Sequence, residues 1–320
     1  MPAARFDFPG GARFAFTILD DADDGTEANL RPIYDLLRDL GMRTTRTVWP
    51  FRHEGPSNFF ACETLEDPGY RAWALELQRQ GFEITWHCAS FESSRRDRTQ
   101  AGLQRFIEVF GVPPRVHANH AWNRENLYWG PDRFDLPMLG ALYRRAVGAS
   151  ADHYQGHVEG SEWWWGDLSR AHVEYARNLT YNTLNLAGIN PSMPYADPAR
   201  PLVPFWFSCS DAETVREFNV LTAPDQADRL AEEGGFSIVA THLGKGFVRD
   251  SQVDPETRRN LEHLAGLGGW FPTTGELLDW LRARRAQDVL PPGEWTRMQQ
   301  RFAWDLARRK VVERLPFLAP

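Results

Sequence analysis

The chain has 320 residues, of which 42% are hydrophobic and 25% charged, and its formal net charge is -7. This composition excludes a disordered or fibrous protein, and the scatter of the 36 basic residues excludes a nucleic-acid binder. Three cysteines lie too far apart for a disulfide framework or a paired-cysteine zinc site.

The N-terminal part alternates strands with helices. Apolar alternation predicts strands at Arg13–Leu19, Arg43–Trp49, Phe82–Trp86 and Arg115–Ala118. Helical spacing predicts helices at Leu30–Leu40, Tyr70–Gln80 and Thr99–Phe110. Pro32 is tolerated in the first of these helices only if it lies in the first turn. This alternation favours parallel strands with helical crossovers, and therefore an α/β fold.

The middle of the chain, about 123–204, is less regular. It contains one expected helix, Leu136–Val147, and long loops rich in aromatic residues, including Trp163-Trp164-Trp165. Loops this long are usually functional or disordered, and the aromatic residues argue against disorder.

Regular alternation then returns. It predicts strands at Val203–Ser208 and Ser237–Thr241, and helices at Asp225–Glu233, Pro255–Leu267 and Thr274–Arg284. A basic amphipathic helix is expected at Trp295–Val312, packed on the outside of the fold or against another subunit.

Carboxylates and imidazoles follow the expected strands. These residues are Asp20-Asp21, His87, His117, His120, Asp211 and His242. Active sites of parallel α/β folds form at the carboxyl ends of the strands, so we expect these side chains to share one site. Asp and His suit Zn²⁺ or a similar divalent ion, which polarises a carbonyl and lowers the pKa of bound water. Cys88 is a weak candidate nucleophile, because adjacent strand residues point to opposite faces.

At these residues the chain resembles a divergent member of the polysaccharide deacetylase superfamily (NodB homology, carbohydrate esterase family 4). The matching segments are Phe16–Asp21, Gly81–His87, Ile238–His242 and Gly269–Leu278. The resemblance covers roughly Arg13 to Arg284. It implies a distorted (β/α)7–8 barrel, a single domain with enlarged loops. We place the barrel at 1–286, with an aromatic-rich insertion at about 123–204, and a C-terminal helical extension at 287–320.

The resemblance also implies a hydrolase that removes an N- or O-acyl group from a carbohydrate or related amide with the help of a divalent metal, expected to be Zn. By position, Asp20 would be the general base and His242 the general acid, while Asp21 and His87 would be metal ligands. A second alignment places Asp23-Asp24-Gly25 on the family's Asp-Asp-Gly motif. We prefer Asp20-Asp21, because this pair lies directly at the strand end.

Two departures from the family concern the metal. The family's second metal-binding His falls on Phe91, and its Arg-containing third motif is replaced by Asn119–Asn126. Either His120 or His117 replaces the missing ligand, or the metal site is altered or absent. We prefer His120, which lies just past the strand and can turn inward.

Polar and aromatic residues near the expected site suit a sugar or a carboxylate. The substrate-binding candidates are His117, Asn119, Asn123, Asn126, Trp164, Asp167 and Lys245. Tryptophan can stack on a sugar ring. Lys245 lies between two glycines and could approach an anionic group closely, although the spacing is not that of a phosphate loop.

Two other functions stay open. A glycoside hydrolase or lyase on the same barrel would need no metal and would use paired carboxylates drawn from Asp20, Asp21, Asp211 and Glu162. A non-catalytic carbohydrate-binding relative would have lost the metal, as Phe91 suggests.

The expected partner is a small-molecule or oligosaccharide substrate, with a homo-oligomer left open. We expect no nucleic acid and no membrane partner. Residues 1–10 lack the features of a signal peptide, and no apolar stretch reaches the length of about 20 residues that spans a bilayer, so we expect a cytoplasmic protein.

Overall fold

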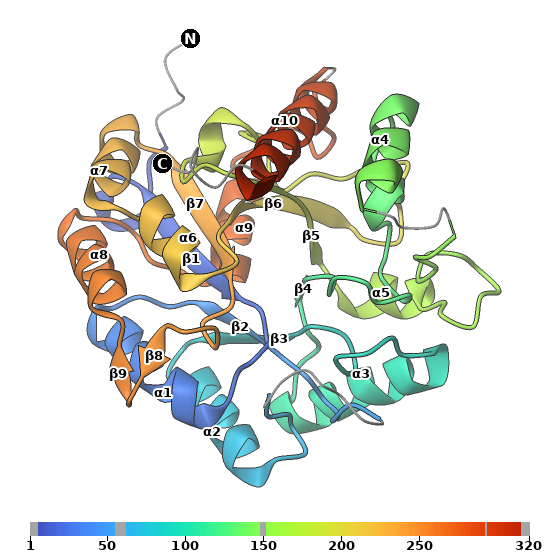
Figure 1. Ribbon diagram of the computed structural model, residues 1–320, viewed down its shortest axis with the longest axis horizontal. Helices are drawn as coiled ribbons and strands as arrows, with labels where there is room; N and C mark the ends of the chain where they lie inside the picture. Colours follow the sequence, from blue (N-terminus) through green and yellow to red (C-terminus); the bar gives the residue numbers. More distant parts are fainter. Residues whose placement is uncertain (1–5, 55–61, 148–151, 292, 315–320) are drawn as a thin grey trace.

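Seven parallel strands form a closed barrel in the computed structural model, which describes residues 6–54, 62–147, 152–291 and 293–314 (Figure 1). The strands follow one another in sequence order around the barrel, and β7 closes it by pairing with β1. They are β1 (Ala15–Asp20), β2 (Thr45–Val48), β3 (Glu83–Trp86), β4 (Val116–His117), β5 (Tyr175–Tyr181), β6 (Phe205–Asp211) and β7 (Phe236–Thr241). This architecture confirms the predicted (β/α) barrel.

Helices surround the barrel (Figure 1). They are α1 (Glu27–Asp39), α2 (Pro68–Arg79), α3 (Arg96–Phe110), α4 (Pro137–Val147), α5 (Gly166–His172), α6 (Val215–Leu221), α7 (Pro224–Glu233), α8 (Pro255–Gly266), α9 (Thr274–Arg282) and α10 (Glu294–Arg314). Short 3-10 turns are η1 (Pro9–Gly11), η2 (Gly130–Arg133) and η3 (Leu186–Gly188), and β8 (Val248–Arg249) pairs with β9 (Gln252–Val253). Because helices cover the outside of the barrel, both faces of β1 and β7 are buried along their length.

Helix α1 begins earlier than predicted. Thr26 caps it, with its hydroxyl accepting from the backbone N–H of Asn29 and the Asn29 side chain accepting in return from the backbone N–H of Thr26. Pro32 therefore lies inside the helix, beyond the first turn, and the expectation that it lies in the first turn was wrong. The capping box determines where the helix starts, and the helix tolerates the loss of the one backbone hydrogen bond that Pro32 cannot donate.

Strand β5 was not predicted, and neither were the short helices α5 and α6. The register between β5 and β6 shifts, since Arg177 pairs with Phe207 but Thr180 pairs with Cys209. Three steps along β5 therefore match two along β6, which is a β-bulge. The bulge interrupts the alternation that identifies a strand, and the buried polar residues Arg177 and Asn178 obscure it further.

Helix α10 packs on its own barrel, beside the segment that leads into α4. Gln299 Oε1 accepts from the backbone N–H groups of Asp135 (2.9 Å) and Leu136 (3.3 Å), just before α4. The Tyr181 hydroxyl at the end of β5 donates to the carbonyl of Met298 at 3.2 Å. No helix in the described ranges is both long and apolar enough to cross a membrane.

We expect Gln299→Ala to lower the free energy of unfolding by about 1–3 kcal/mol, because two backbone donors lose their acceptor at a position only 1% exposed. Urea denaturation measures this change. Gln299→Glu keeps an acceptor oxygen and should lose less. An unchanged stability in Gln299→Ala would show that the contact does not hold α10 in place.

Candidate metal centre and active site

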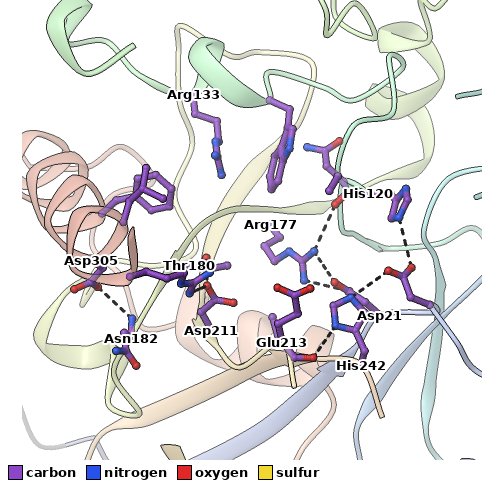
Figure 2. Close-up of a pocket in the computed structure, with 18 of the residues that line it drawn as sticks. Asp21, His120, Arg133, Arg177, Thr180, Asn182, Asp211, Glu213, His242 and Asp305 are labelled. Atoms are coloured by element: carbon purple, nitrogen blue, oxygen red, sulfur yellow. Dashed lines mark hydrogen bonds and ion pairs between the residues drawn. The ribbon is translucent and has the colours of Figure 1, made fainter. Parts of the chain in front are cut away.

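A cavity of about 370 Å³ lies where the carboxyl ends of the barrel strands meet (Figure 2). Residues within or just after β1, β3, β4, β5, β6 and β7 line it. From these strand ends come Asp21, Asp23, His87, Asn119, His120, Arg177, Thr180, Asn182, Asp211, Glu213 and His242. The parallel barrel thus brings residues that are far apart in the sequence to one place.

Three buried side chains in this cavity form a candidate metal centre: Asp23, His87 and His120. One ligand atom from each lies within 4.8 Å of the others. Asp23 Oδ1 is 3.5 Å from His120 Nε2, is buried and accepts no hydrogen bond within the described structure. A buried carboxylate oxygen without a donor is costly, which is consistent with a cation at this place.

Hydrogen bonds orient both imidazoles for metal binding. His87 Nδ1 lies 2.7 Å from the Ala118 carbonyl oxygen, so it must donate, and its Nε2 keeps a lone pair. His120 Nδ1 lies 3.1 Å from Asn123 Oδ1, while the Asn123 amide nitrogen donates to Glu125 Oε1 at 3.0 Å. His120 Nδ1 therefore donates, which leaves Nε2, on the side of Asp23, as the atom available to a metal.

The donor set fits a divalent ion such as Zn²⁺. Burial lowers the pKa of His87 to about 3, so this imidazole is neutral, as a metal ligand must be. One carboxylate and two imidazoles leave coordination positions open for water and substrate, which is the arrangement of catalytic sites. Phe91, at the family's second His position, packs its ring 4.8 Å from that of His120. The third candidate ligand, His120, therefore comes from the segment that follows β4.

A residue with left-handed backbone lies one position after Asp23 and His87 and two positions after His120. Asp24, Cys88 and Trp122 have φ angles of 55°, 84° and 71°, which non-glycine residues rarely adopt. Strain of this kind is typical of functional sites. Cys88 is buried, and burial raises the pKa of its thiol well above the usual value, so it is not an activated nucleophile.

Asp20, expected as the general base, lies outside the cavity and is 0% exposed. Its Oδ2 accepts from Arg46 at 2.7 Å and from the Tyr34 hydroxyl at 2.8 Å, and its Oδ1 accepts from the backbone N–H of Leu243 at 2.8 Å. Neighbouring residues at a strand end point in opposite directions, so Asp20 faces β2 and α1 while Asp21 faces the cavity. This geometry does not suit the role expected for Asp20.

Asp21, expected as a metal ligand, lies beside the cluster. Its two oxygens accept from Arg177 at 3.1 and 2.8 Å, and Oδ2 is 4.0 Å from His87 Nε2. Burial alone would raise the pKa of Asp21, but opposing charges, that of the Arg177 guanidinium first, hold it below the usual value. The carboxylate within the cluster is that of Asp23, which neither alignment gives as the metal ligand. The preferred alignment gives this role to Asp21, and the second alignment, position for position, gives it to Asp24.

His242 lies at the edge of the cluster, as a residue after β7 should. Its Nε2 is 3.3 Å from Asp23 Oδ2, and its Nδ1 is 3.2 Å from the Glu213 carbonyl oxygen. Burial lowers the pKa of His242, but Asp23 and Asp21 raise it more, so it lies above the usual value. Lys245 Nζ also contacts Asp23 Oδ2, at 3.4 Å.

Among the other substrate-binding candidates, Asn119 lines the cavity and His117 does not. His117 is buried against Trp165, with ring centres 5.2 Å apart, and its Nε2 faces Asn119 Oδ1 at 3.1 Å. It is therefore not the replacement ligand.

Asn123, Asn126, Trp164 and Asp167 also lie outside the cavity. Asn126 donates to the His120 carbonyl, so it supports the loop rather than a substrate. Asp167 is exposed, and its carboxylate pairs with Arg96, which also donates to the Trp164 carbonyl. The tryptophan triplet is a packing element and not a substrate wall.

A second wall of the cavity was missed by sequence reasoning. It consists of Trp129, Arg133 and Tyr143 from the enlarged middle segment, and Phe302, Asp305, Leu306 and Arg309 from α10. Figure 2 shows Arg133 directed into the cavity, and Asp305 near Asn182 at the side away from His120. Only the cluster of aromatic residues around 128–134 pointed to this wall, because the contacts join segments far apart in sequence.

Three solved structures share this architecture. A protein from Mycobacterium smegmatis that is named as a polysaccharide deacetylase matches with a TM-score of 0.51 at 13% identity, over 91% of this chain and 98% of its own. The chain has the polysaccharide deacetylase fold. A Pseudomonas aeruginosa protein named in the same way matches with a TM-score of 0.50 at 11% identity, over 87% of this chain and 94% of its own. A PuuE allantoinase matches with a TM-score of 0.51 at 12% identity, over 87% and 93%.

No protein-family model matches the sequence of this chain, and no curated protein matches it. The likeness to solved structures therefore establishes the fold, and the reaction must be argued from the site.

We expect Asp20→Asn to lower the free energy of unfolding by about 3–5 kcal/mol, because it leaves the fully buried Arg46 without a counter-ion. Urea denaturation measures the loss. Asp39→Asn, at an exposed carboxylate paired with Arg38, is the matched control and should change little. Equal effects of the two substitutions would contradict a structural role for Asp20.

Glu125, which accepts a hydrogen bond from Asn123, should make the stability of the protein depend on pH. It is 0% exposed, and burial raises its pKa to about 7 from a model-peptide value of 4.5. The folded state therefore binds more protons than the unfolded state between these values, so the free energy of unfolding falls as the pH rises, by about 3 kcal/mol between about pH 4 and pH 8. Denaturation of Glu125→Gln should lack this fall. A variant with the wild-type pH dependence would show that Glu125 does not titrate in this range.

Proposed function

We propose that this chain is a hydrolase that uses a divalent metal to remove an N- or O-acyl group from a carbohydrate or a related amide. The observation that carries the proposal is the cluster of Asp23, His87 and His120 in the cavity wall, in which hydrogen bonds at Nδ1 leave Nε2 of both imidazoles for a metal. The deacetylase fold supports it. The fold does not choose the substrate, since its relatives include proteins named as polysaccharide deacetylases and an allantoinase.

A divalent ion held by Asp23, His87 and His120 would polarise the acyl carbonyl and acidify a water molecule. Asp21 lies next to this cluster as an ionised carboxylate and would take the proton from the attacking water. Arg177 would hold Asp21 in place through its two hydrogen bonds. His242 lies on the cavity wall with a pKa above its usual value, and in its protonated form it would give a proton to the leaving nitrogen or oxygen.

The atoms balance in this scheme. Water adds to the acyl carbon, the C–N or C–O bond breaks, and the products are a carboxylic acid and an amine or alcohol. Asp21 gains one proton as His242 loses one, and exchange with solvent restores both. No redox partner is required.

The metal-independent glycosidase is less well supported. Of its four candidate carboxylates, Asp20 and Glu162 lie outside the cavity. Asp21 and Asp211 line it, each paired with an arginine. A general acid for glycosidic cleavage needs a raised pKa, whereas the pKa of Asp21 is lowered.

Elemental analysis of the purified protein tests the proposal. We expect about one equivalent of zinc or another divalent transition metal, lost in Asp23→Ala and His120→Ala. Asp21→Asn should keep the metal and lose acetate release from N-acetylated glycans by about 100-fold or more. His263→Ala, at a surface histidine paired with Asp228, is the control.

Absence of metal in the wild-type protein, even after loading, would refute the metal-assisted reaction. Binding in this cavity without any bond cleavage would then support the non-catalytic alternative. Retention of metal in both ligand variants would refute the assignment of these ligands.

A further inference from the structure

Arg133 is the arginine of the cavity that has no carboxylate partner among the described residues. It ends η2, is 4% exposed, and its side chain is directed into the cavity (Figure 2). Among the described residues its Nε and Nη1 face two backbone oxygens, those of Gly130 and Asn178, each at the long distance of 3.4 Å, and the neutral hydroxyl of Tyr143 is a further hydrogen-bond partner. A buried guanidinium normally has stronger acceptors.

Aromatic rings surround this guanidinium. Its central carbon lies 4.1 Å from the ring centre of Trp129, 5.0 Å from that of Phe302 and 5.2 Å from that of Tyr143. These rings line the same cavity as the candidate metal centre. Ring faces stabilise a cation and exclude water, but they do not neutralise its charge. Burial lowers the pKa of Arg133, yet an arginine side chain stays protonated in a protein.

The other arginines of the cavity are neutralised. Arg177 forms an ion pair with Asp21, and Arg309 forms one with Asp211. Arg133 therefore contributes an unmatched positive charge, from a different segment of the chain than the metal cluster. A charge placed in this way costs free energy until a negative group meets it.

We propose that Arg133 binds a carboxylate of the substrate, so that the substrate is a small acidic amide. A guanidinium presents a planar pair of donors that matches a carboxylate, and the aromatic rings around Arg133 provide apolar walls that strengthen the interaction. A cavity of about 370 Å³ is in the range that holds a small molecule. The inference that the substrate is an amide rests on the proposed function. The inference that it carries a carboxylate rests on Arg133 alone. A phosphate dianion would need a second unpaired cation, which the described walls do not offer.

Matched ligand pairs test the proposal on the full chain. We would titrate N-acetylglycine against N-acetylglycinamide, and N-acetylmuramic acid against N-acetylglucosamine, by calorimetry. The acid of at least one pair should bind about tenfold or more tightly than its neutral partner. Arg133→Met should remove this preference without weakening the neutral compounds, and Arg133→Lys should keep part of it. Arg145→Met, at an exposed arginine on α4, should leave the preference unchanged.

Equal binding of acid and neutral partner in both pairs, or no binding of either acid, would overturn the proposal. Stronger binding of inorganic phosphate or sulfate through Arg133 would overturn the choice of a carboxylate. If Arg133→Met does not fold, the wild-type preference and Arg133→Lys still decide.

Metal content, measured in the same samples, separates the two proposals. A protein without metal that prefers the acids through Arg133 would refute only the proposed reaction. A metal-containing protein that releases acetate but binds the acid and the neutral compound of each pair equally would refute only the proposal that Arg133 binds a carboxylate.

Discussion

The position of the site depends on the buried ion pair between Asp20 and Arg46, although Asp20 does not line the cavity. It joins β1 to Arg46 of β2, to Tyr34 of α1 and to the backbone that follows β7. Arg46 also donates to the carbonyl of Asp21 at 3.0 Å, so the same ion pair holds the turn that carries Asp23. Gly25 completes this arrangement, since a Cβ there would lie 2.1 Å from the Arg46 guanidinium. A fully buried ion pair thus fixes where Asp23, the carboxylate of the candidate metal centre, lies.

Much of the barrel and part of the site could be predicted from the sequence. Strand alternation located β1, β3 and β7, and the parallel arrangement then implied that His87 and His242 share one rim. The different positions of the three aspartates, one outside the cavity, one beside the cluster and one within it, could not be predicted in this way. Which of Asp20, Asp21 and Asp23 turns inward depends on the path of a turn and on its buried partner, and neither has a signal in the local pattern.

Arg177 shows a second limit of sequence reasoning. Alternation would place Arg177 and Thr180 on opposite faces of β5, yet both line the cavity because a bulge lies between them. The wall that contains Arg133 and Phe302 is less predictable still. It exists only because α10 returns to pack beside the segment before α4. The residues at the strand ends can be expected from the barrel fold. The wall opposite them depends on tertiary packing between the enlarged middle segment and α10.

Three residues with left-handed backbone lie just after the candidate metal ligands. At these positions, a change that lowers backbone strain would also loosen the geometry of the candidate ligands. At Asp24, Cys88 and Trp122 a glycine would relieve the backbone, but it would also widen the conformations open to Asp23, His87 and His120. Selection for heat resistance alone would therefore accept glycine at these positions, while selection for tight metal binding would reject it. Rigidity at these three turns is a local cost that the rest of the barrel must offset.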